Sequence, residues 1–367
     1  MSGLVPRPGI LDIAPYEPGR AKTGQGGQVV KLSSNESAFG ASPAAQAAYE
    51  ALAPALHRYP DGGSSELRAA LAARYGLDAA RIVCGCGSDD ILQLMCRAYV
   101  GPGDEVIYSR HSFSIYGIAA HSVGARCVIT EEENYTPSVD ATLAALSENT
   151  RLVFLANPGN PSGTYLSGAE LRRLHAGLPD HVALVLDGAY AEFVTAPDYE
   201  AGARLAGEAG NVVMARTFSK IYGLAGLRLG WAYGSAGIID VLNRLRGPFN
   251  VSSAAQVAGL AALEDEDFVA RVREHTSQWR AWLYDELTAL GLFVAPSVTN
   301  FLLLRFADAP GKSAAEADAF LTARGILLRR MEGYGLPDHL RLTVGTAQEN
   351  HLVIDSLRAF LRAGRKG

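Results

Sequence analysis

Short apolar runs rich in valine, isoleucine and leucine alternate with helical stretches through the middle of the chain. The runs are apolar at consecutive positions, which is typical of strands buried on both faces of a parallel sheet. They lie at residues 81–84, 105–108, 126–129, 152–155, 183–186 and 212–215, with helices predicted at 89–99, 112–122 and 167–176. The pattern predicts an α/β fold with a mostly parallel sheet covered by helices.

The two ends of the chain follow other patterns. The first 30 residues are rich in proline and glycine and predict an extended arm, followed by helices at 42–52 and 65–75. After a break at 247–250, a helical region at 252–290 precedes strands at 293–295, 300–305, 326–329 and 340–344 and helices at 313–323 and 349–363. We therefore expect an arm over residues 1–30, a large domain over 31–249 and a smaller α+β domain over 250–367.

Composition narrows the class of protein. The chain has 367 residues, 48% hydrophobic and 19% charged, a balance typical of a globular protein with a large core. Its net charge of −5 and scattered lysines and arginines predict neither a nucleic-acid nor a membrane partner. Four cysteines make no disulfide framework, and the histidines show no metal-ligand spacing, so we expect a cytoplasmic, reduced protein without a metal site.

A lysine follows the run at 212–215, in the segment Thr217-Phe218-Ser219-Lys220. A glycine-rich stretch that ends near Arg228 comes next. Such a lysine could form a Schiff base with an aldehyde whose phosphate is held by Thr217, Ser219 and Arg228, because nearby cations and partial burial depress the pKa of an amine. The alternative is a solvated lysine in a turn.

Polar residues also follow two other apolar runs. Asp187 comes directly after residues 182–186, where a carboxylate is costly unless it is paired, for example with a protonated pyridine nitrogen. Tyr190 could reach the same ligand. Asn160 lies in a loop with two Asn-Pro steps and could donate to a ring oxygen. Taken singly, Asp187 could equally cap a turn and Asn160 could equally belong to one.

The segment 84–90 leads from a predicted strand into a predicted helix and contains Gly87. Backbone N–H groups at a helix N-terminus bind phosphate, and Ser88 is a good N-cap. Because the carboxylates of Asp89 and Asp90 would repel a phosphate, contacts through backbone amides and the Ser88 hydroxyl are expected. A nicotinamide oxidoreductase is the alternative, but its dinucleotide fingerprint needs a glycine where Asp90 stands.

The order of these residues resembles that of the fold-type-I aminotransferases that use pyridoxal phosphate, and among them the histidinol-phosphate aminotransferase family. The resemblance covers nearly the whole chain. It includes residues 7–16 (RPGILDIAPY), 31–43 (KLSSNESAFGASP), 58–61 (RYPD), 87–92 (GSDDIL), 216–230 and 333–346 (GYGLPDHLRLTVGT). It implies a seven-stranded, mostly parallel sheet in the large domain and a smaller α+β C-terminal domain.

The resemblance also implies roles around the cofactor. Lys220 would hold pyridoxal phosphate and later move a proton, and Asp187 would keep the pyridine nitrogen protonated. Tyr190 and Asn160 would bind the phenolic oxygen, and Phe113 would stack on the ring where this family usually has tyrosine. The phosphate would be bound by Gly87, Ser88, Asp89, Thr217, Ser219 and Arg228, and by Tyr59 of the neighbouring subunit.

For the substrate, the resemblance places Arg329 and Arg341 on the anionic end, since guanidinium groups match phosphate and carboxylate. Tyr16 would add a phosphate contact, and Asn35 and Glu36 would line the pocket. The implied reaction is transamination between L-histidinol phosphate and 2-oxoglutarate in histidine biosynthesis, giving imidazole acetol phosphate and L-glutamate. The implied assembly is a homodimer with shared active sites.

Departures from the family pattern keep other functions open. Gly188 stands where an acidic residue is common, and Arg330, expected to be a solvated side chain, stands where proline is common. The first alternative is an aromatic amino acid aminotransferase on the same fold, and a second is a decarboxylase. A catalytically silent ligand-binding regulator is a third, although the presence of Lys220, Asp187 and Arg228 argues against it.

Overall fold

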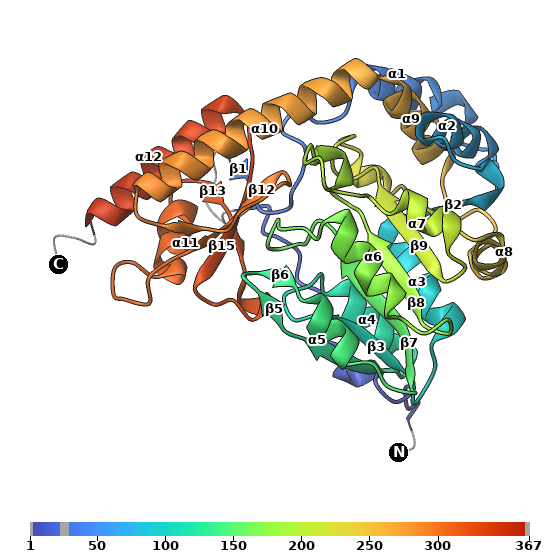
Figure 1. The fold of residues 1–367 in the computed structure, drawn as a ribbon. Helices are drawn as coiled ribbons and strands as arrows, with labels where there is room; N and C mark the ends of the chain where they lie inside the picture. The colour runs from blue at the N-terminus through green and yellow to red at the C-terminus, as the bar shows by residue number, and fades with distance from the viewer. Residues whose placement is uncertain (1–2, 23–28, 364–367) are drawn as a thin grey trace.

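A seven-stranded sheet forms the centre of the computed structural model, which describes residues 3–22 and 29–363 (Figure 1). Its strand order is β2-β10-β9-β8-β7-β3-β4. The strands are β2 (Ile82–Gly85), β3 (Glu105–Ser109), β4 (Arg126–Thr130), β7 (Thr150–Ala156), β8 (Ala183–Asp187), β9 (Val212–Thr217) and β10 (Gly230–Gly234). Only β10 runs antiparallel to its neighbours in this sheet, so the predicted α/β fold with a mostly parallel sheet is confirmed.

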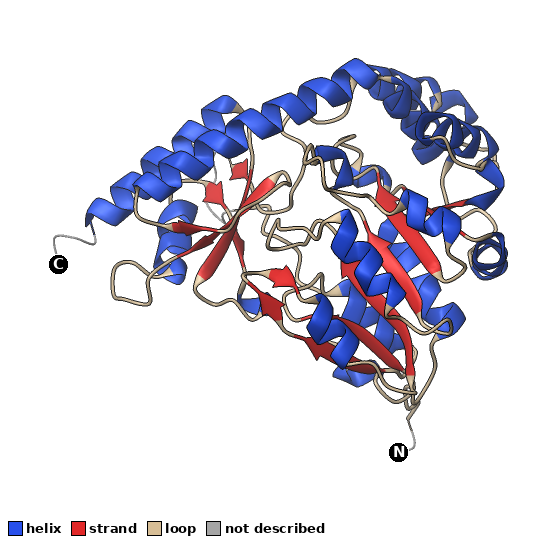
Figure 2. Ribbon diagram, in the orientation of Figure 1, coloured by secondary structure: helices blue, strands red, loops and turns tan. Residues whose placement is uncertain are grey.

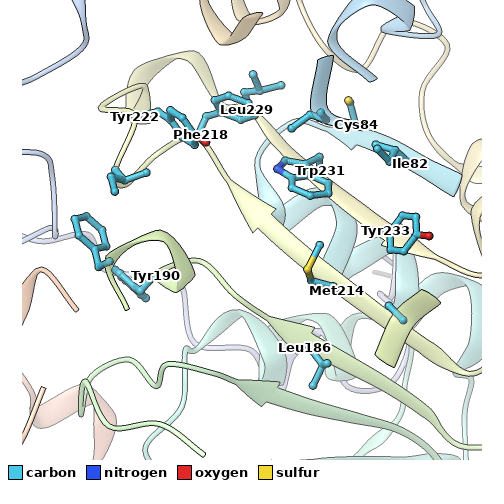
Figure 3. Close-up of a cluster of buried hydrophobic side chains, with 14 of the residues drawn as sticks. Ile82, Cys84, Leu186, Tyr190, Met214, Phe218, Tyr222, Leu229, Trp231 and Tyr233 are labelled. Carbon is cyan, nitrogen blue, oxygen red and sulfur yellow. The ribbon is translucent and has the colours of Figure 1, made fainter. Parts of the chain in front are cut away.

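Both faces of this sheet are buried, as the continuous apolar runs predict. Along β8, Leu184 and Leu186 face a first core and Ala183 and Val185 face a second. Figure 3 shows side chains from neighbouring strands, among them Trp231, projecting into the first core.

Helices cover the two faces in separate layers (Figure 2). The first core is closed by α2 (Ser65–Tyr75), α5 (Val139–Ala144), α6 (Gly168–Ala176), α7 (Ala203–Glu208) and α9 (Ser253–Glu264), and α1 (Pro43–Ala51) packs along α9. The second core is closed by α3 (Ser88–Tyr99), α4 (Ile115–Ser122) and α8 (Ala236–Leu245). A short hairpin, β5 (Glu132–Glu133) and β6 (Thr136–Pro137), lies toward the C-terminal part of the chain.

The C-terminal part forms a second, smaller sheet that is antiparallel, in the order β11-β12-β15-β14. Its strands are β11 (Phe293–Val294), β12 (Phe301–Arg305), β14 (Arg329–Arg330) and β15 (His339–Thr343). It packs with α10 (Glu266–Ala289), α11 (Ala314–Thr322) and α12 (Ala347–Ala363) around a third core. This part is the predicted small α+β unit.

Two segments join the large and small units. Strand β1 (Val30–Lys31) pairs in parallel with β13 (Ile326–Leu327), so the segment that leads into the large unit is paired with the small one. Helix α10 packs Phe268 and Val272 into the first core and Leu283 and Leu287 into the third. The predicted domain limits at residues 31 and 250 stay predictions, because β1 and α10 contact both units.

Local differences from the sequence pattern have physical causes. The region at 252–290 is two helices, because Asp265 ends α9 and its carboxylate accepts the Phe268 N–H at 3.2 Å, which caps α10. The strand expected at 326–329 is split between two sheets, because β13 pairs with β1 and β14 pairs with β15. Across residues 3–22 and 29–363, none of the helices has the length and hydropathy needed to cross a bilayer.

Candidate active site

A pocket lies where the carboxyl ends of the parallel strands meet the small sheet. Ligands bind at this edge in open α/β sheets because loops from several strands converge there. Of the predicted site residues, these line it: Tyr16, Asn35, Ser88, Asp89, Phe113, Asn160, Asp187, Tyr190, Thr217, Ser219, Lys220, Arg228, Arg329 and Arg341. The structure therefore brings together residues from the arm, the large sheet and the small sheet.

Lys220 lies in the loop after β9 and is held from two sides. Its Nζ donates to the backbone carbonyl of Ser34 at 3.3 Å and lies 5.7 Å from the centre of the Tyr190 ring. Burial, and then the positive charge of Arg341, lower the pKa of Lys220 to about 8. A larger fraction of this amine is therefore neutral near physiological pH than of an ordinary lysine, as a nucleophilic lysine requires.

Asp187 is the last residue of β8 and is buried, with an exposed fraction of only 5%. The Tyr116 hydroxyl donates to Oδ2 at 2.8 Å and the Ala189 N–H donates to Oδ1 at 3.2 Å. Burial is the largest cause that raises the pKa of Asp187 to about 6, while the Tyr116 hydrogen bond opposes it. The charge of Lys220 also lowers the pKa of Asp187, but among the described residues no cation forms an ion pair with its carboxylate, so a protonated ring nitrogen would relieve an unfavourable burial.

An anion cradle is built where α3 begins. Gly87 is the N-cap of this helix, with φ of 82°, and Ser88 is its first residue, so the expectation of Ser88 as N-cap is wrong. Glycine is needed there because a Cβ at Gly87 would lie 2.4 Å from the Arg228 guanidinium. Helix N-terminal amides, the Ser88 hydroxyl and this guanidinium together suit a phosphate.

Two hydroxyls complete the cradle beside Arg228. The Thr217 hydroxyl donates to the Ser219 hydroxyl at 3.0 Å, and Arg228 Nη1 donates to Ser219 Oγ at 3.3 Å. Arg228 Nη2 also lies 3.4 Å from the Asp89 carboxylate, which neutralises part of the charge. The Asp89 side chain thus faces Arg228, in keeping with a phosphate contact through its backbone.

Arginines from the small sheet close the pocket. Arg341 on β15 is 5% exposed, and Arg329 on β14 is its register partner. Arg341 donates to the Asn160 side-chain oxygen and, at 3.1 Å, to the Ser33 carbonyl, and its buried Nε has no hydrogen-bond partner in the described chain. Arg329 donates to the Glu17 carbonyl at 2.7 Å, so the arm and the small sheet meet over the pocket.

Asn35 and Tyr190 form one unit within the wall. Asn35 Nδ2 donates to the Tyr190 hydroxyl at 2.8 Å, and the Asn35 N–H donates to Thr343 Oγ1 at 3.0 Å. Burial raises the pKa of Tyr190 to about 12, so this hydroxyl keeps its proton at neutral pH. Tyr190 therefore has a hydrogen available for an acceptor atom in the pocket.

Three predicted residues do not line the pocket within the part of the chain that is described. Gly87 contributes its backbone to the cradle from behind Ser88. The Glu36 carboxylate pairs with Lys31 Nζ at 2.7 Å. Tyr59 is 82% exposed and stacks on Phe249 with ring centres 4.6 Å apart.

Sequence reasoning missed two tyrosines that line the pocket. Tyr116 lies inside the helical pattern at 112–122, where an aromatic residue is indistinguishable from a core residue, and 71 positions separate it from Asp187. Tyr334 lies in the segment 333–346, whose family resemblance was the only available signal.

Comparison with known proteins agrees with this geometry. Residues 27–357 match the family "Aminotransferase class I and II", and the chain belongs to this class of pyridoxal-phosphate-dependent aminotransferases. The chain is 54% identical over 360 residues to the histidinol-phosphate aminotransferase of Maricaulis maris (strain MCS10), which covers 98% of this chain and 99% of that relative. It is 55% identical to the one of Rhodopseudomonas palustris (strain BisA53), at the same coverage. It belongs to the histidinol-phosphate aminotransferase family, as the resemblance indicated.

A solved structure matches the fold as closely as the sequence relatives suggest. The histidinol-phosphate aminotransferase of Sinorhizobium meliloti, in complex with pyridoxal-5'-phosphate, has a TM-score of 0.86 and 30% identity over 93% of both chains. The predicted fold, enzyme class and cofactor are therefore confirmed, and the oxidoreductase alternative is not supported.

The residues present fit pyridoxal phosphate group by group. An amine with a lowered pKa faces the pocket, and a buried carboxylate forms no ion pair within residues 3–22 and 29–363. A helix N-terminus with Ser88, Ser219 and Arg228 suits a dianion. These three features correspond to the aldehyde, the ring nitrogen and the phosphate of the cofactor.

Proposed function

We propose that this protein transfers the amino group from L-histidinol phosphate to 2-oxoglutarate, giving imidazole acetol phosphate and L-glutamate, in histidine biosynthesis. The observation that carries the proposal is the end-to-end identity of about half the residues with relatives of that name. The arginines of the small sheet supply the cationic wall that a phosphate ester and a dicarboxylate both need.

The residues of the large domain hold and use the cofactor. The chemistry that pyridoxal phosphate supplies when bound is stabilisation of negative charge at the substrate α-carbon and storage of the amino group between two half-reactions. Lys220 would hold the aldehyde through Nζ and would move the proton at the substrate α-carbon. Asp187 holds the proton on the pyridine nitrogen. Tyr190 and Asn160 donate to the phenolic oxygen.

The remaining cofactor contacts hold the ring and the phosphate in place. Phe113 stacks on the ring. The phosphate is held by the α3 N-terminus at 87–89, by the hydroxyls of Thr217 and Ser219, and by Arg228.

Substrate anions bind between the arm and the small sheet. Arg341, whose buried Nε has no partner among the described residues, binds a substrate carboxylate or phosphate. Arg329 from the small sheet and Tyr16 from the arm add further contacts. Asn35 lines the wall near the imidazole, whereas Glu36, paired with Lys31, does not line it. L-Histidinol phosphate carries a phosphate, and 2-oxoglutarate carries two carboxylates. The same arginines therefore bind the anionic end of the substrate in each half-reaction.

The active unit is a homodimer, and the protein is cytoplasmic. Tyr59 supports the dimer, because it is exposed on its own chain and reaches no part of its own pocket among the described residues. In the dimer Tyr59 binds the cofactor phosphate of the neighbouring subunit.

The substrate is tested by comparing kcat/KM for L-histidinol phosphate and L-phenylalanine with 2-oxoglutarate as acceptor, following L-glutamate. A preference of at least about tenfold for histidinol phosphate, which corresponds to about 1.4 kcal/mol, is expected because only that substrate has a phosphate for the arginines. An equal or reversed preference identifies an aromatic amino acid aminotransferase instead. Release of CO₂ without glutamate would identify a decarboxylase, and binding without turnover a regulator.

A further inference from the structure

The Tyr116 side chain, which contacts Asp187, is enclosed by other aromatic rings. It lies on α4, is 0% exposed, and stacks on Phe154 with ring centres 4.7 Å apart and planes 10° apart. Tyr108 and Phe113 pack edge-on against it at 6.1 Å and 6.3 Å. Aromatic rings packed in this way have little rotational freedom, so the position of the hydroxyl is determined by the core.

That hydroxyl makes a directed hydrogen bond to the carboxylate. It donates to Oδ2 of Asp187 at 2.8 Å, and the Ala189 N–H donates to the other oxygen. A charge-assisted hydrogen bond between buried partners is stronger than a neutral one and fixes the plane of the carboxylate. Phenylalanine would fill the same space, so packing alone does not account for the hydroxyl.

The charged groups around Asp187 divide into two sets. Asp89, from α3, disfavours the ionised carboxylate, and Lys220, from the loop after β9, favours it. The Tyr116 hydrogen bond, from α4, also favours the ionised form and opposes burial, which is the largest effect. Without the hydroxyl, the balance would move toward a protonated carboxyl.

We propose that Tyr116 is a positioning residue that holds the Asp187 carboxylate ionised and turned toward the pyridine nitrogen of the cofactor. The proposal rests on the role proposed above for Asp187. Tyr116 would have this effect before any substrate binds, so the affinity of the apoprotein for pyridoxal phosphate measures the effect directly.

The first test compares Tyr116→Phe with Tyr108→Phe. Both remove one hydroxyl from the same aromatic cluster, but Tyr108 makes no hydrogen bond to Asp187 in the described chain. For Tyr116→Phe the dissociation constant of pyridoxal phosphate, measured by titrating apoprotein, is expected to rise roughly tenfold, the usual effect of losing a hydrogen bond to a charged group. For Tyr108→Phe it stays within about twofold.

The pH profile separates this role from a structural one. The Asp187 pKa is about 6, and loss of the hydrogen bond raises it. As the pH is lowered, the affinity for the cofactor should therefore begin to decrease at a higher pH in Tyr116→Phe than in the parent protein. A general loss of packing would lower the affinity equally at every pH. Equal affinity at every pH, or a uniform decrease without this shift, overturns the proposal.

The second test is a double-mutant cycle with Asp187→Asn. If Tyr116 acts through the carboxylate, adding Tyr116→Phe to Asp187→Asn weakens cofactor binding no further. An additive effect overturns the proposal. If Asp187→Asn leaves the affinity for pyridoxal phosphate unchanged, the proposed role of Asp187 is wrong, and the inference is wrong with it. If Asp187→Asn lowers this affinity and Tyr116→Phe does not, only the inference is overturned.

Discussion

The ionisation of Lys220 predicts the pH at which the cofactor attaches. A pKa of about 8 leaves half of the amine neutral at pH 8, whereas an ordinary lysine is below about 1% neutral there. The rate of covalent attachment to apoprotein, measured by borohydride trapping and peptide mass spectrometry, should therefore rise through pH 8 and level off about one unit above it. Lys220→Ala should show no attachment.

The same measurement tests why that pKa is low. Arg341 is the second cause after burial, so Arg341→Gln should move the midpoint of the rate profile to higher pH. Arg330→Gln is the control, because Arg330 is exposed and paired with Glu332. A midpoint near pH 10 in the parent protein, or no difference between the variants, would contradict the assignment.

Asp187 should destabilise the protein when the cofactor is absent. Its pKa is about 6 in the folded chain and 3.8 when unfolded, so the folded state binds the proton more tightly and stability is lost as pH rises from about 4 through 6. Asp187→Asn removes that penalty and should raise the free energy of unfolding of apoprotein at pH 8 by up to about 3 kcal/mol, with little change at pH 4.

Denaturant unfolding of apoprotein at the two pH values measures this effect. The exposed Asp285→Asn serves as the control and should change the stability at neither pH. A variant equally stable with its parent at pH 8 would show that the carboxylate is not destabilised by burial.

At the scale of the elements, the phosphate cradle depends on how closely β10 approaches the start of α3. A Cβ added at Gly230 would lie 2.3 Å from the Ser88 backbone nitrogen, so Gly230→Ala must push the helix N-terminus away. Overpacking of this kind costs about 1–3 kcal/mol of stability, and cofactor affinity should fall as the Ser88 amide moves. Thermal unfolding and cofactor titration measure the two effects.

The matched control for this prediction is Gly226→Ala, at a glycine four residues earlier where an added Cβ meets open space. It should leave affinity and stability nearly unchanged. Equal behaviour of the two variants would mean that the cradle tolerates movement of α3.

Elements were predictable from the sequence where burial on both sides made an apolar run. Strand β8 is such a case, with all five residues buried. Strand β10 was not found, because its sequence GWAYG has two glycines and no β-branched residue, and only pairing with β2 and β9 makes it a strand. The role of Tyr116 could not be predicted for a related reason, since a hydrogen bond between residues 71 positions apart leaves no local sequence pattern.

At the scale of the whole molecule, the site is made by parts distant in the chain. The arm, the large sheet and the small sheet each supply cations or hydroxyls, and α10 ties the large and small cores together (Figure 1). The motifs after β8 and β9 could be predicted because ligands bind at the carboxyl ends of parallel strands. The register of Arg329 with Arg341 could not, because it depends on which strands of the small sheet pair.

Tyr59 allows the shared active site to be tested on the assembled protein. Coexpression of Lys220→Ala chains with Tyr59→Ala chains gives mixed dimers in which one site has Lys220 from one chain and Tyr59 from the other. If Tyr59 acts across the dimer, that site is complete, and an equal mixture should recover about one quarter of the wild-type activity, since half of the dimers are mixed and each has one such site. The assay uses a cofactor concentration at which Tyr59→Ala alone is inactive.

The control replaces the second chain with one that carries both substitutions, which leaves no complete site in any dimer. Exposure of Tyr59 on its own chain, stacked on Phe249 and outside its own pocket, is the reason to expect recovery only in the first mixture. If Tyr59 served its own subunit instead, each mixed dimer would lack either the lysine or the tyrosine at both sites, and neither mixture would recover activity. Recovery in the first mixture alone would therefore establish both the dimer and the direction in which Tyr59 reaches.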